Sequence, residues 1–187
     1  ARSRQRGGVL PGPVVGTVMS NLGLERALQR LGIPFERTQV GDRYILERLK
    51  ATNGVLGGEP SGHIICRDRT TTGDGIVSAL QILAEMIKTG KGLNDLLDDL
   101  ETYPQRLVNV TLPKKVDVLS EPEIRHCVQT AERELGDTGR ILLRPSGTEP
   151  LLRVMVEGQD ADQVESLAHR LADAVRAQVE SVSEIEH

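Results

Sequence analysis

Residues 141–156 have the sequence ILLRPSGTEPLLRVMV, in which two apolar runs flank a polar loop. Residues 141–143 and 151–156 are rich in branched apolar side chains and are bounded by turn residues, so each run predicts a short strand. Between them, residues 144–150 contain two prolines that fix φ and one glycine that permits a backbone conformation other residues resist. The stretch therefore predicts two strands joined by a polar loop.

The polar loop has the chemistry of an anion site. A loop of this kind can aim successive backbone N–H groups into one concavity. Arg144 and Arg153 add guanidinium groups, whose planar geometry matches a phosphate, while Ser146 and Thr148 add hydroxyl donors. We therefore hypothesise a phosphate-binding loop that includes Gly147. The alternative is an ordinary turn whose Arg and Glu side chains pair at the surface.

The composition limits the classes of function. The chain has 187 residues, a net charge of −4, and only three aromatic side chains, Phe35, Tyr44 and Tyr103. Without a basic field or stacking residues, nucleic acid is not an expected partner. The sequence has no apolar run of about 20 residues, so it predicts no membrane span. Cys66 and Cys127 lie far apart, which indicates two reduced thiols in a cytosolic protein.

Strands and helices alternate through the first half of the chain. Strands are predicted at residues 14–20, 35–40, 54–56 and 64–66, and helices at residues 24–31, 44–50, 76–87 and 93–100. Residues 20–21 form a helix cap by composition. The long helix carries four apolar side chains on one face, Ile76, Leu80, Leu83 and Ile87. This alternation predicts a three-layer α/β domain with a mixed sheet.

The pattern changes after a polar stretch at residues 101–106. A strand is predicted at residues 107–112, and Ser120 with Glu123 predicts a capping box for the following helix. The two strands around the polar loop come next, and Asp160 caps a final amphipathic helix. The second half therefore predicts a small α+β domain of β-α-β-β-α order.

A second loop, residues 57–63, has the sequence GGEPSGH. A carboxylate at Glu59 and a hydroxyl at Ser61 can point the same way from an extended backbone. Glu59 can accept hydrogen bonds from two neighbouring hydroxyls, so the pair suits a sugar. The alternative is that Glu59 caps a backbone group and that His63 is a partly buried structural imidazole.

Two further loops have weaker signals. Asp42 and Arg43 are candidates for the edge of the same pocket, although a helix that starts with Asp42 as its cap explains them equally well. Residues 70–75 directly precede the long helix, so capping is the preferred explanation there. Neither Ser61 nor Ser146 lies in a complete Gly-x-Ser-x-Gly motif, and no spacing predicts a metal site. The sequence predicts binding groups without catalytic ones.

Five stretches occur in an order that resembles a known family. They are VGTVMSN (15–21), GDRY (41–44), GEPSGH (58–63), TTTGDG (70–75) and RPSGTEP (144–150). Together they resemble the bacterial phosphoglucosamine mutases of the α-D-phosphohexomutase superfamily, over nearly the whole chain from about Val14. The TTTGDG form resembles the glucosamine branch more than the phosphomannomutase branch.

The resemblance implies an enzyme that interconverts glucosamine 6-phosphate and glucosamine 1-phosphate, on the route to UDP-N-acetylglucosamine and peptidoglycan. In that family a phosphoserine donates its phosphoryl group, a glucosamine bisphosphate is the intermediate, and Mg²⁺ supports the transfer. The resemblance gives Glu59 and Ser61 the role of gripping sugar hydroxyls, and it places Asp42 and Arg43 at a loop that reports which end of the sugar is bound.

The same resemblance assigns the polar loop of the second half to the phosphate that is not reacting. Four of its residues take this role, namely Arg144, Ser146, Gly147 and Thr148. The chain departs from the family because it has neither an Asp-Gly-Asp metal loop nor a phosphoserine loop. The resemblance places both loops in the first two of four domains, so the chain is expected to hold no catalytic residue and no Mg²⁺ ligand.

The expected organisation follows from this departure. Residues 1–13 would be the tail of a preceding domain, residues 14–103 a sugar-binding α/β domain, and residues 104–187 a phosphate-binding domain. The chain alone is expected to have no mutase activity. The expected partners are a sugar phosphate and the N-terminal domains of the same polypeptide, with no nucleic acid or membrane; a homodimer is one option.

Three other functions remain open on the sequence. The chain can be part of another phosphohexomutase, such as a phosphomannomutase or phosphoglucomutase. It can be a non-catalytic module that binds a sugar phosphate. It can also be a structural protein whose glycine-rich loops are only turns.

Overall fold

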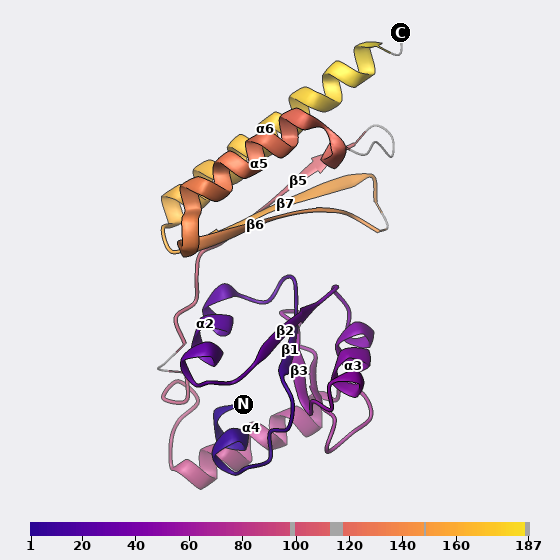
Figure 1. Cartoon of the computed structure of the whole chain (residues 1–187). Helices are drawn as coiled ribbons and strands as arrows, with labels where there is room; N and C mark the ends of the chain where they lie inside the picture. The colour runs from indigo at the N-terminus through magenta and orange to yellow at the C-terminus, as the bar shows by residue number, and fades with distance from the viewer. Residues whose placement is uncertain (98–99, 113–117, 148, 186–187) are drawn as a thin grey trace. The chain divides into compact units, whose positions relative to one another are not determined.

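The computed structural model describes residues 1–97, 100–112, 118–147 and 149–185. The chain forms two compact units, Ala1–Thr102 and Tyr103–His187 (Figure 1). The first unit encloses two small hydrophobic cores, and the second unit encloses one larger core. Within the described residues, no helix combines the length and the apolarity that a bilayer span requires.

The first unit is an α/β fold around a mixed sheet. Its elements are α1 (Arg2–Arg6), β1 (Val14–Thr17), α2 (Leu22–Arg30), β2 (Phe35–Thr38), α3 (Asp42–Ala51), β3 (Leu56–Gly58), β4 (Ile64–Cys66) and α4 (Gly75–Thr89). The strand order is β2-β1-β3-β4. Strand β1 is parallel to β2 and β3, whereas β4 is antiparallel to β3. The predicted mixed sheet is confirmed.

Helices cover both faces of this sheet. Neighbouring residues of β1 point to opposite faces, and each therefore packs against a different helix. Val15 packs with Ile45 and Leu49 of α3 on one face. Val14 packs with Leu28 of α2 on the other. The two small cores therefore lie on opposite faces of one strand, which gives the predicted three layers.

Side chains fix the starts of α2 and α4 as the sequence predicts. The Asn21 side chain accepts a hydrogen bond from the Gly23 N–H at 2.9 Å. Asp74 accepts from the N–H groups of Ile76 and Val77 at 2.8 and 2.9 Å. Capping therefore accounts for Asp74 in the 70–75 loop, as preferred from the sequence.

The helix predicted at residues 93–100 is not formed in the part that is described. Residues 93–96 form turns, residue 97 is a bend, and residues 98–99 lie outside the described part. The Asp95 side chain accepts a hydrogen bond from the Gly92 N–H at 3.0 Å. Such local bonds offer the backbone an alternative to a helix, which explains the wrong prediction.

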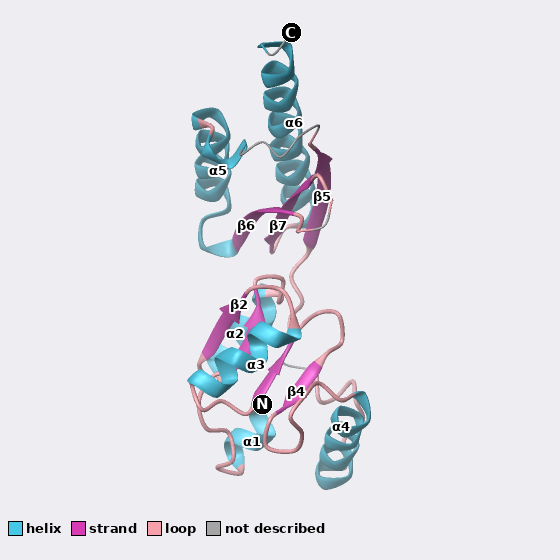
Figure 2. Cartoon of the chain, turned by 90° about the vertical axis from the view of Figure 1, so that its right-hand side faces the viewer, coloured by secondary structure: helices cyan, strands magenta, loops and turns pink. Residues whose placement is uncertain are grey.

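The second unit is an antiparallel sheet with helices on one face (Figure 2). Its elements are β5 (Gln105–Thr111), η1 (Val118–Ser120), α5 (Pro122–Leu135), η2 (Gly136–Thr138), β6 (Gly139–Pro145), β7 (Leu151–Gly158) and α6 (Ala161–Ile185). The strand order is β5-β7-β6. Leu152, Val154 and Val156 of β7 are buried in one core with α5 and α6. The predicted β-α-β-β-α order is confirmed.

Only one of the two caps predicted in this unit is present. Asp160 accepts a hydrogen bond from the Gln163 N–H at 3.0 Å, at the start of α6. The capping box is wrong, because Ser120 belongs to η1 and Glu121 is the N-cap of α5 without a side-chain cap bond. Pro122 suits the first helical position and moves the helix start past Ser120.

Candidate functional site

Two predicted loops of the first unit lie at the same edge of its sheet. Because β1, β2 and β3 are parallel, the loops after Thr17, Thr38 and Gly58 all leave from their carboxyl ends. The chain moves from β1 to one side to form β2 and then crosses to the other side to form β3. Ligands of open α/β sheets bind outside such a reversal point. The topology therefore makes this edge the candidate binding edge.

At this edge the β3–β4 loop gathers a carboxylate, a hydroxyl and an imidazole. Ser61 Oγ lies 2.9 Å from His63 Nδ1, and Glu59 Oε1 lies 3.1 Å from the same nitrogen. The Glu59 N–H donates to the His63 carbonyl at 3.0 Å, and Gly62 makes the turn with a φ of 95°. A left-handed φ of this kind favours glycine.

The side chains of Ser61 and His63 are accessible to a ligand, whereas that of Glu59 is mostly buried. The side chain of His63 is 59% exposed, whereas that of Glu59 is 8% exposed. Ser61 is also exposed. His63 is therefore not the partly buried imidazole considered as an alternative. The carboxylate of Glu59 is held in place and contacts no backbone N–H of the described residues.

Asp42 and Arg43 lie at the start of α3, after β2. Both are exposed, and Gly41 is the N-cap, with a φ of 129°. The interpretation of Asp42 as the cap is therefore wrong. Arg43 pairs with Glu47 at 2.8 Å within its own helix, and this hydrogen bond raises the pKa of the Arg43 guanidinium. In this conformation no hydrogen bond or ion pair of the described residues joins Arg43 to Glu59 or Ser61.

In the second unit, strand register brings the two predicted arginines together. Arg144 of β6 lies directly opposite Arg153 of β7. Leu143 and Val154 belong to the core under the helices, so their neighbours Arg144 and Arg153 point to the other face of the sheet. Like charges directly opposite one another destabilise a sheet. The pair is therefore not explained by the stability of the fold.

The hydrogen bonding of this pair is also incomplete. The Nε atoms of Arg144 and Arg153 are buried and have no hydrogen-bond partner among the described residues. A terminal nitrogen of Arg153 forms an ion pair with Glu149 at 3.8 Å, as the alternative of a surface turn expects, but this distance is too long for a hydrogen bond. A buried donor without a partner costs about 1–3 kcal/mol. An anion that accepts from both guanidinium groups would remove this cost.

The loop beside the arginines has a defined shape. The Ser146 N–H donates to the Leu151 carbonyl at 2.8 Å, and Ser146 Oγ accepts from the Glu149 N–H at 3.3 Å. Gly147 is exposed, and a Cβ placed there would meet nothing within 4 Å. Its φ is not in the left-handed region, so the loop does not use the conformational freedom that glycine permits. Thr148 lies outside the described residues.

Sequence reasoning missed a third polar group on this face. Asn109 of β5 lies directly opposite Arg153, on the strand edge away from Arg144. Asn109 is exposed, and its neighbour Val110 is buried, so its side chain lies on the face that carries the two arginines. Only the register of β5 with β7 reveals this position, because no spacing in the sequence relates the two residues.

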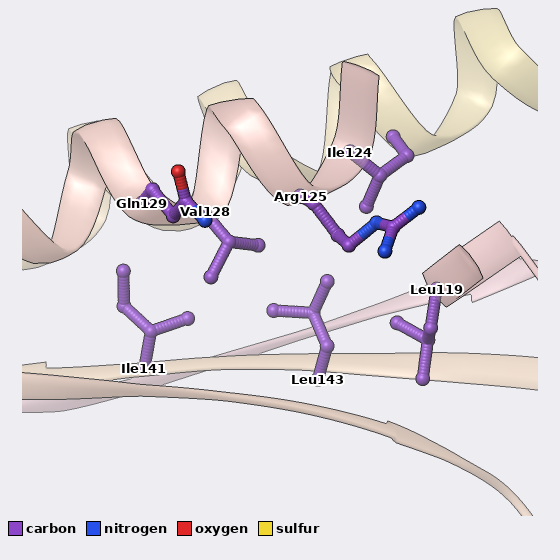
Figure 3. Close-up of a pocket in the computed structure, with 7 residues that line it drawn as sticks. All are labelled: Leu119, Ile124, Arg125, Val128, Gln129, Ile141 and Leu143. Atoms are coloured by element: carbon purple, nitrogen blue, oxygen red, sulfur yellow. The ribbon is translucent and has the colours of Figure 1, made fainter. Parts of the chain in front are cut away.

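A groove of about 320 Å³ lies elsewhere in this unit, between α5 and β6. Figure 3 shows Ile141 and Leu143 pointing from the sheet towards α5, and Arg125 extending from α5 across from Leu143. The groove lies on the helical face, whereas Arg144 and Arg153 lie on the opposite face. It is a mostly apolar gap beside the core and shares no lining residue with the arginine pair.

The described residues do not form a metal site. They contain no group of three or more His, Cys, Asp or Glu side chains placed to hold an ion. The chemistry that they offer is therefore of two kinds. The first unit presents acceptors and donors for hydroxyls, and the second presents two guanidinium groups for an anion.

Comparison with protein families matches both units. The model of the phosphoglucomutase/phosphomannomutase α/β/α domain III matches residues 1–103. The model of the phosphoglucomutase/phosphomannomutase C-terminal domain matches residues 107–174. The two matches follow the same order as the two units, and they agree with the superfamily indicated by the sequence motifs.

Phosphoglucosamine mutases are among the relatives with high sequence identity. Phosphoglucosamine mutase of Methylococcus capsulatus is 60% identical over 94% of this chain, and that of Nitrosococcus oceani is 59% identical over 94%. The chain spans 39% of the length of each of these curated relatives.

Solved structures share the fold at lower identity. A structure of Aspergillus fumigatus N-acetylphosphoglucosamine mutase has a TM-score of 0.77 and 23% identity, over 94% of this chain and 40% of that one. The same fungal enzyme in complex with GlcNAc-6P and magnesium has a TM-score of 0.73 and 22% identity, over 89% of this chain and 42% of that one.

Proposed function

Because the chain belongs to the phosphoglucomutase/phosphomannomutase family, we propose that it is the substrate-binding part of a phosphoglucosamine mutase. The complete enzyme interconverts glucosamine 6-phosphate and glucosamine 1-phosphate through a phosphoserine and a glucosamine bisphosphate. The high identity to phosphoglucosamine mutases supports glucosamine over mannose or glucose as the sugar. The free thiols of Cys66 and Cys127 are typical of the cytoplasm, where we place the protein.

The observation that carries this proposal is the pairing of Arg144 with Arg153. Two buried guanidinium nitrogens face the same side of the sheet without a partner among the described residues. A phosphate has the charge and the oxygens to bind both, in bonds about twice as strong as neutral ones. Ser146 and Gly147 would complete the anion site from the adjoining loop, together with Thr148.

The sugar would be held by the β3–β4 loop. The Glu59 carboxylate is nearly buried and its neighbours are fixed, so it can accept from sugar hydroxyls without a large entropic cost. Ser61 and His63 can each exchange their mutual contact for one to the sugar. Asp42 and Arg43 are proposed to join this site once Arg43 leaves Glu47.

These roles are positioning roles. Phosphoryl transfer depends mainly on orientation and on neutralisation of charge. In the second unit, Arg144 would anchor a phosphate, and in the first unit, Glu59 would hold sugar hydroxyls. Bound Mg²⁺ would supply neutralisation of charge at the reacting phosphate. The described residues do not fit this ion, so we assign it and the reactive serine to domains outside this chain.

Titration of the purified chain with glucosamine 6-phosphate tests the binding proposal. Arg144→Ala should weaken binding about 10- to 100-fold, since one bond to a charged group contributes about 1.5–3 kcal/mol. Arg133→Ala is the matched control, because Arg133 is exposed on α5. Free glucosamine and glucose 6-phosphate separate the phosphate and sugar contributions. Equal affinity for all variants would reject the site.

A coupled enzyme assay tests whether the catalytic groups lie in domains outside this chain. With Mg²⁺ and a glucose bisphosphate activator, the chain alone should give no glucosamine 1-phosphate above background, while a polypeptide with the upstream domains should turn over. Turnover by the chain alone would reject the assignment of the catalytic groups to other domains. Absence of turnover by the longer polypeptide would reject the mutase function itself.

A further inference from the structure

Helix α4 presents its apolar side chains to solvent. Ile76, Leu80, Leu83 and Ile87 are 76%, 56%, 51% and 84% exposed. We call these four residues the α4 apolar face; they recur at helical spacing and so share one side of the helix. The sequence pattern alone suggests a face that packs inward, and the structure places it outward. Large exposed apolar faces mark interaction sites.

The opposite side of α4 contacts the rest of the first unit through polar groups. Ser78 Oγ lies 3.3 Å from the Ile64 carbonyl, at β4. Arg4 of α1 donates to Gln81 at 3.3 Å, and Ser3 of α1 donates to Glu85. The usual arrangement of an amphipathic helix, apolar side inward, is therefore reversed. Rotation of α4 about its axis would bury the apolar face only by breaking these contacts.

The chain itself indicates what covers this face. The start of α1 lies beside α4, since Ser3 donates to Glu85 and Arg4 donates to Gln81 at 3.3 Å. Residues 1–103 match domain III of the family, and the chain spans 39% of its bacterial relatives. Any chain that precedes Ala1 therefore emerges next to α4. A segment tethered there has an effective concentration in the millimolar range, well above that of a second free copy.

We propose that the α4 apolar face is the docking surface for the part of the polypeptide that precedes Ala1, and that it is not a contact between two copies of this chain. The occupant presents a complementary apolar surface from an upstream domain. This inference rests on the proposed longer polypeptide, but not on its substrate or its activity. Docking at α4 would fix the first unit relative to the domains that carry out the chemistry.

Thiol labelling of Leu83→Cys tests the proposal in the longer polypeptide and in the 187-residue chain. Labelling by a maleimide should be at least about 10-fold slower in the longer polypeptide, because a docked surface reacts only when it opens. Glu132→Cys, at an exposed position of α5, should label at similar rates in both. Unsubstituted proteins give the background from Cys66 and Cys127. Equal rates for Leu83→Cys would overturn the proposal.

Introduction of a charge at position 83 gives a second measurement, the change in melting temperature. Leu83→Glu should lower the Tm of the longer polypeptide by several degrees and leave that of the 187-residue chain nearly unchanged, since only the former buries residue 83. Sedimentation of the 187-residue chain addresses the other occupant. A dimer that Leu83→Glu dissociates, together with unprotected Leu83→Cys in the longer polypeptide, would assign the face to a second copy and reject the proposal.

Discussion

Strands β6 and β7 carry two pairs of facing charged residues on the same side of one sheet. In one pair the charges are opposite and hydrogen-bonded, and in the other pair both charges are positive. Arg140 lies opposite Glu157, and Arg144 lies opposite Arg153. Arg140 Nε is 2.5 Å from Glu157, whose side chain is fully buried and also accepts from Gln105 at 3.3 Å. At the other pair, the buried Nε atoms have no partner among the described residues.

This difference separates a structural role from a binding role. The same two strands, in the same register, accommodate a carboxylate at one position and a second guanidinium at the other. Stability favours opposite charges at facing positions. A like-charge pair with unsatisfied donors is therefore expected where a ligand supplies the missing charge. Of the four predictions below, two change a charged member of a facing pair, Glu157 or Arg153, and two change residues beside Arg144 and Arg153.

The largest effect is expected from Glu157→Gln, which makes the first pair uncompensated. Removal of one partner of a buried ion pair costs about 3–5 kcal/mol, and the low end applies because Arg140 is 21% exposed. Urea unfolding of the Tyr103–His187 unit measures this loss. The control Glu123→Gln, at an exposed site of α5, should change stability by less than about 0.5 kcal/mol. A loss for Glu157→Gln as small as the control's would contradict the assignment.

Arg153→Glu makes the second pair resemble the first. Affinity for glucosamine 6-phosphate should fall about 30-fold, the equivalent of about 2 kcal/mol. The free energy of unfolding should rise by up to about 1 kcal/mol, because an attractive cross-strand pair replaces a repulsive one. Calorimetric titration and urea unfolding report the two changes separately. Unchanged affinity, or a loss of stability, would mean that the two arginines do not form an anion site.

Asn109→Ala tests whether the anion site extends to β5. A neutral hydrogen bond contributes about 1 kcal/mol, so affinity should fall about fivefold without loss of stability. Thr111→Ala is the matched control, since Thr111 lies on the same face of β5 but opposite Leu151. Equal affinities for the two variants would limit the site to the β6–β7 hairpin.

Gly147→Ala should have the smallest effect on stability. Its Cβ would meet nothing within 4 Å, so the free energy of unfolding should change by less than about 0.5 kcal/mol. A selective loss of phosphate affinity would indicate that the ligand approaches this backbone. Gly57→Ala is the contrast, because its Cβ would lie 2.8 Å from the Val15 carbonyl and should destabilise the first unit clearly. A large unfolding effect of Gly147→Ala would show that the loop needs glycine for its fold.

The sequence predicted the strands and helices better than it predicted which residues lie opposite one another in the folded chain. The apolar runs around residues 144–150 predict β6 and β7, because strand formation depends on local composition. The chemistry of Arg144 and Arg153 indicated an anion, but only the register places them face to face. Asn109 was missed because cross-strand neighbours can lie anywhere in the sequence. The outward apolar side of α4 was missed because periodicity defines a face and not its direction.

The three separate cores have a consequence for how the chain folds. The second unit contains one continuous core, whereas the first divides its apolar side chains between two faces of a small sheet. Cooperativity extends only as far as shared burial, so each unit should melt in its own transition. The hairpin with Arg144 and Arg153 can then reach its native register while the first unit is still unfolded. Phosphate should raise the melting temperature of that one transition and leave the other where it is.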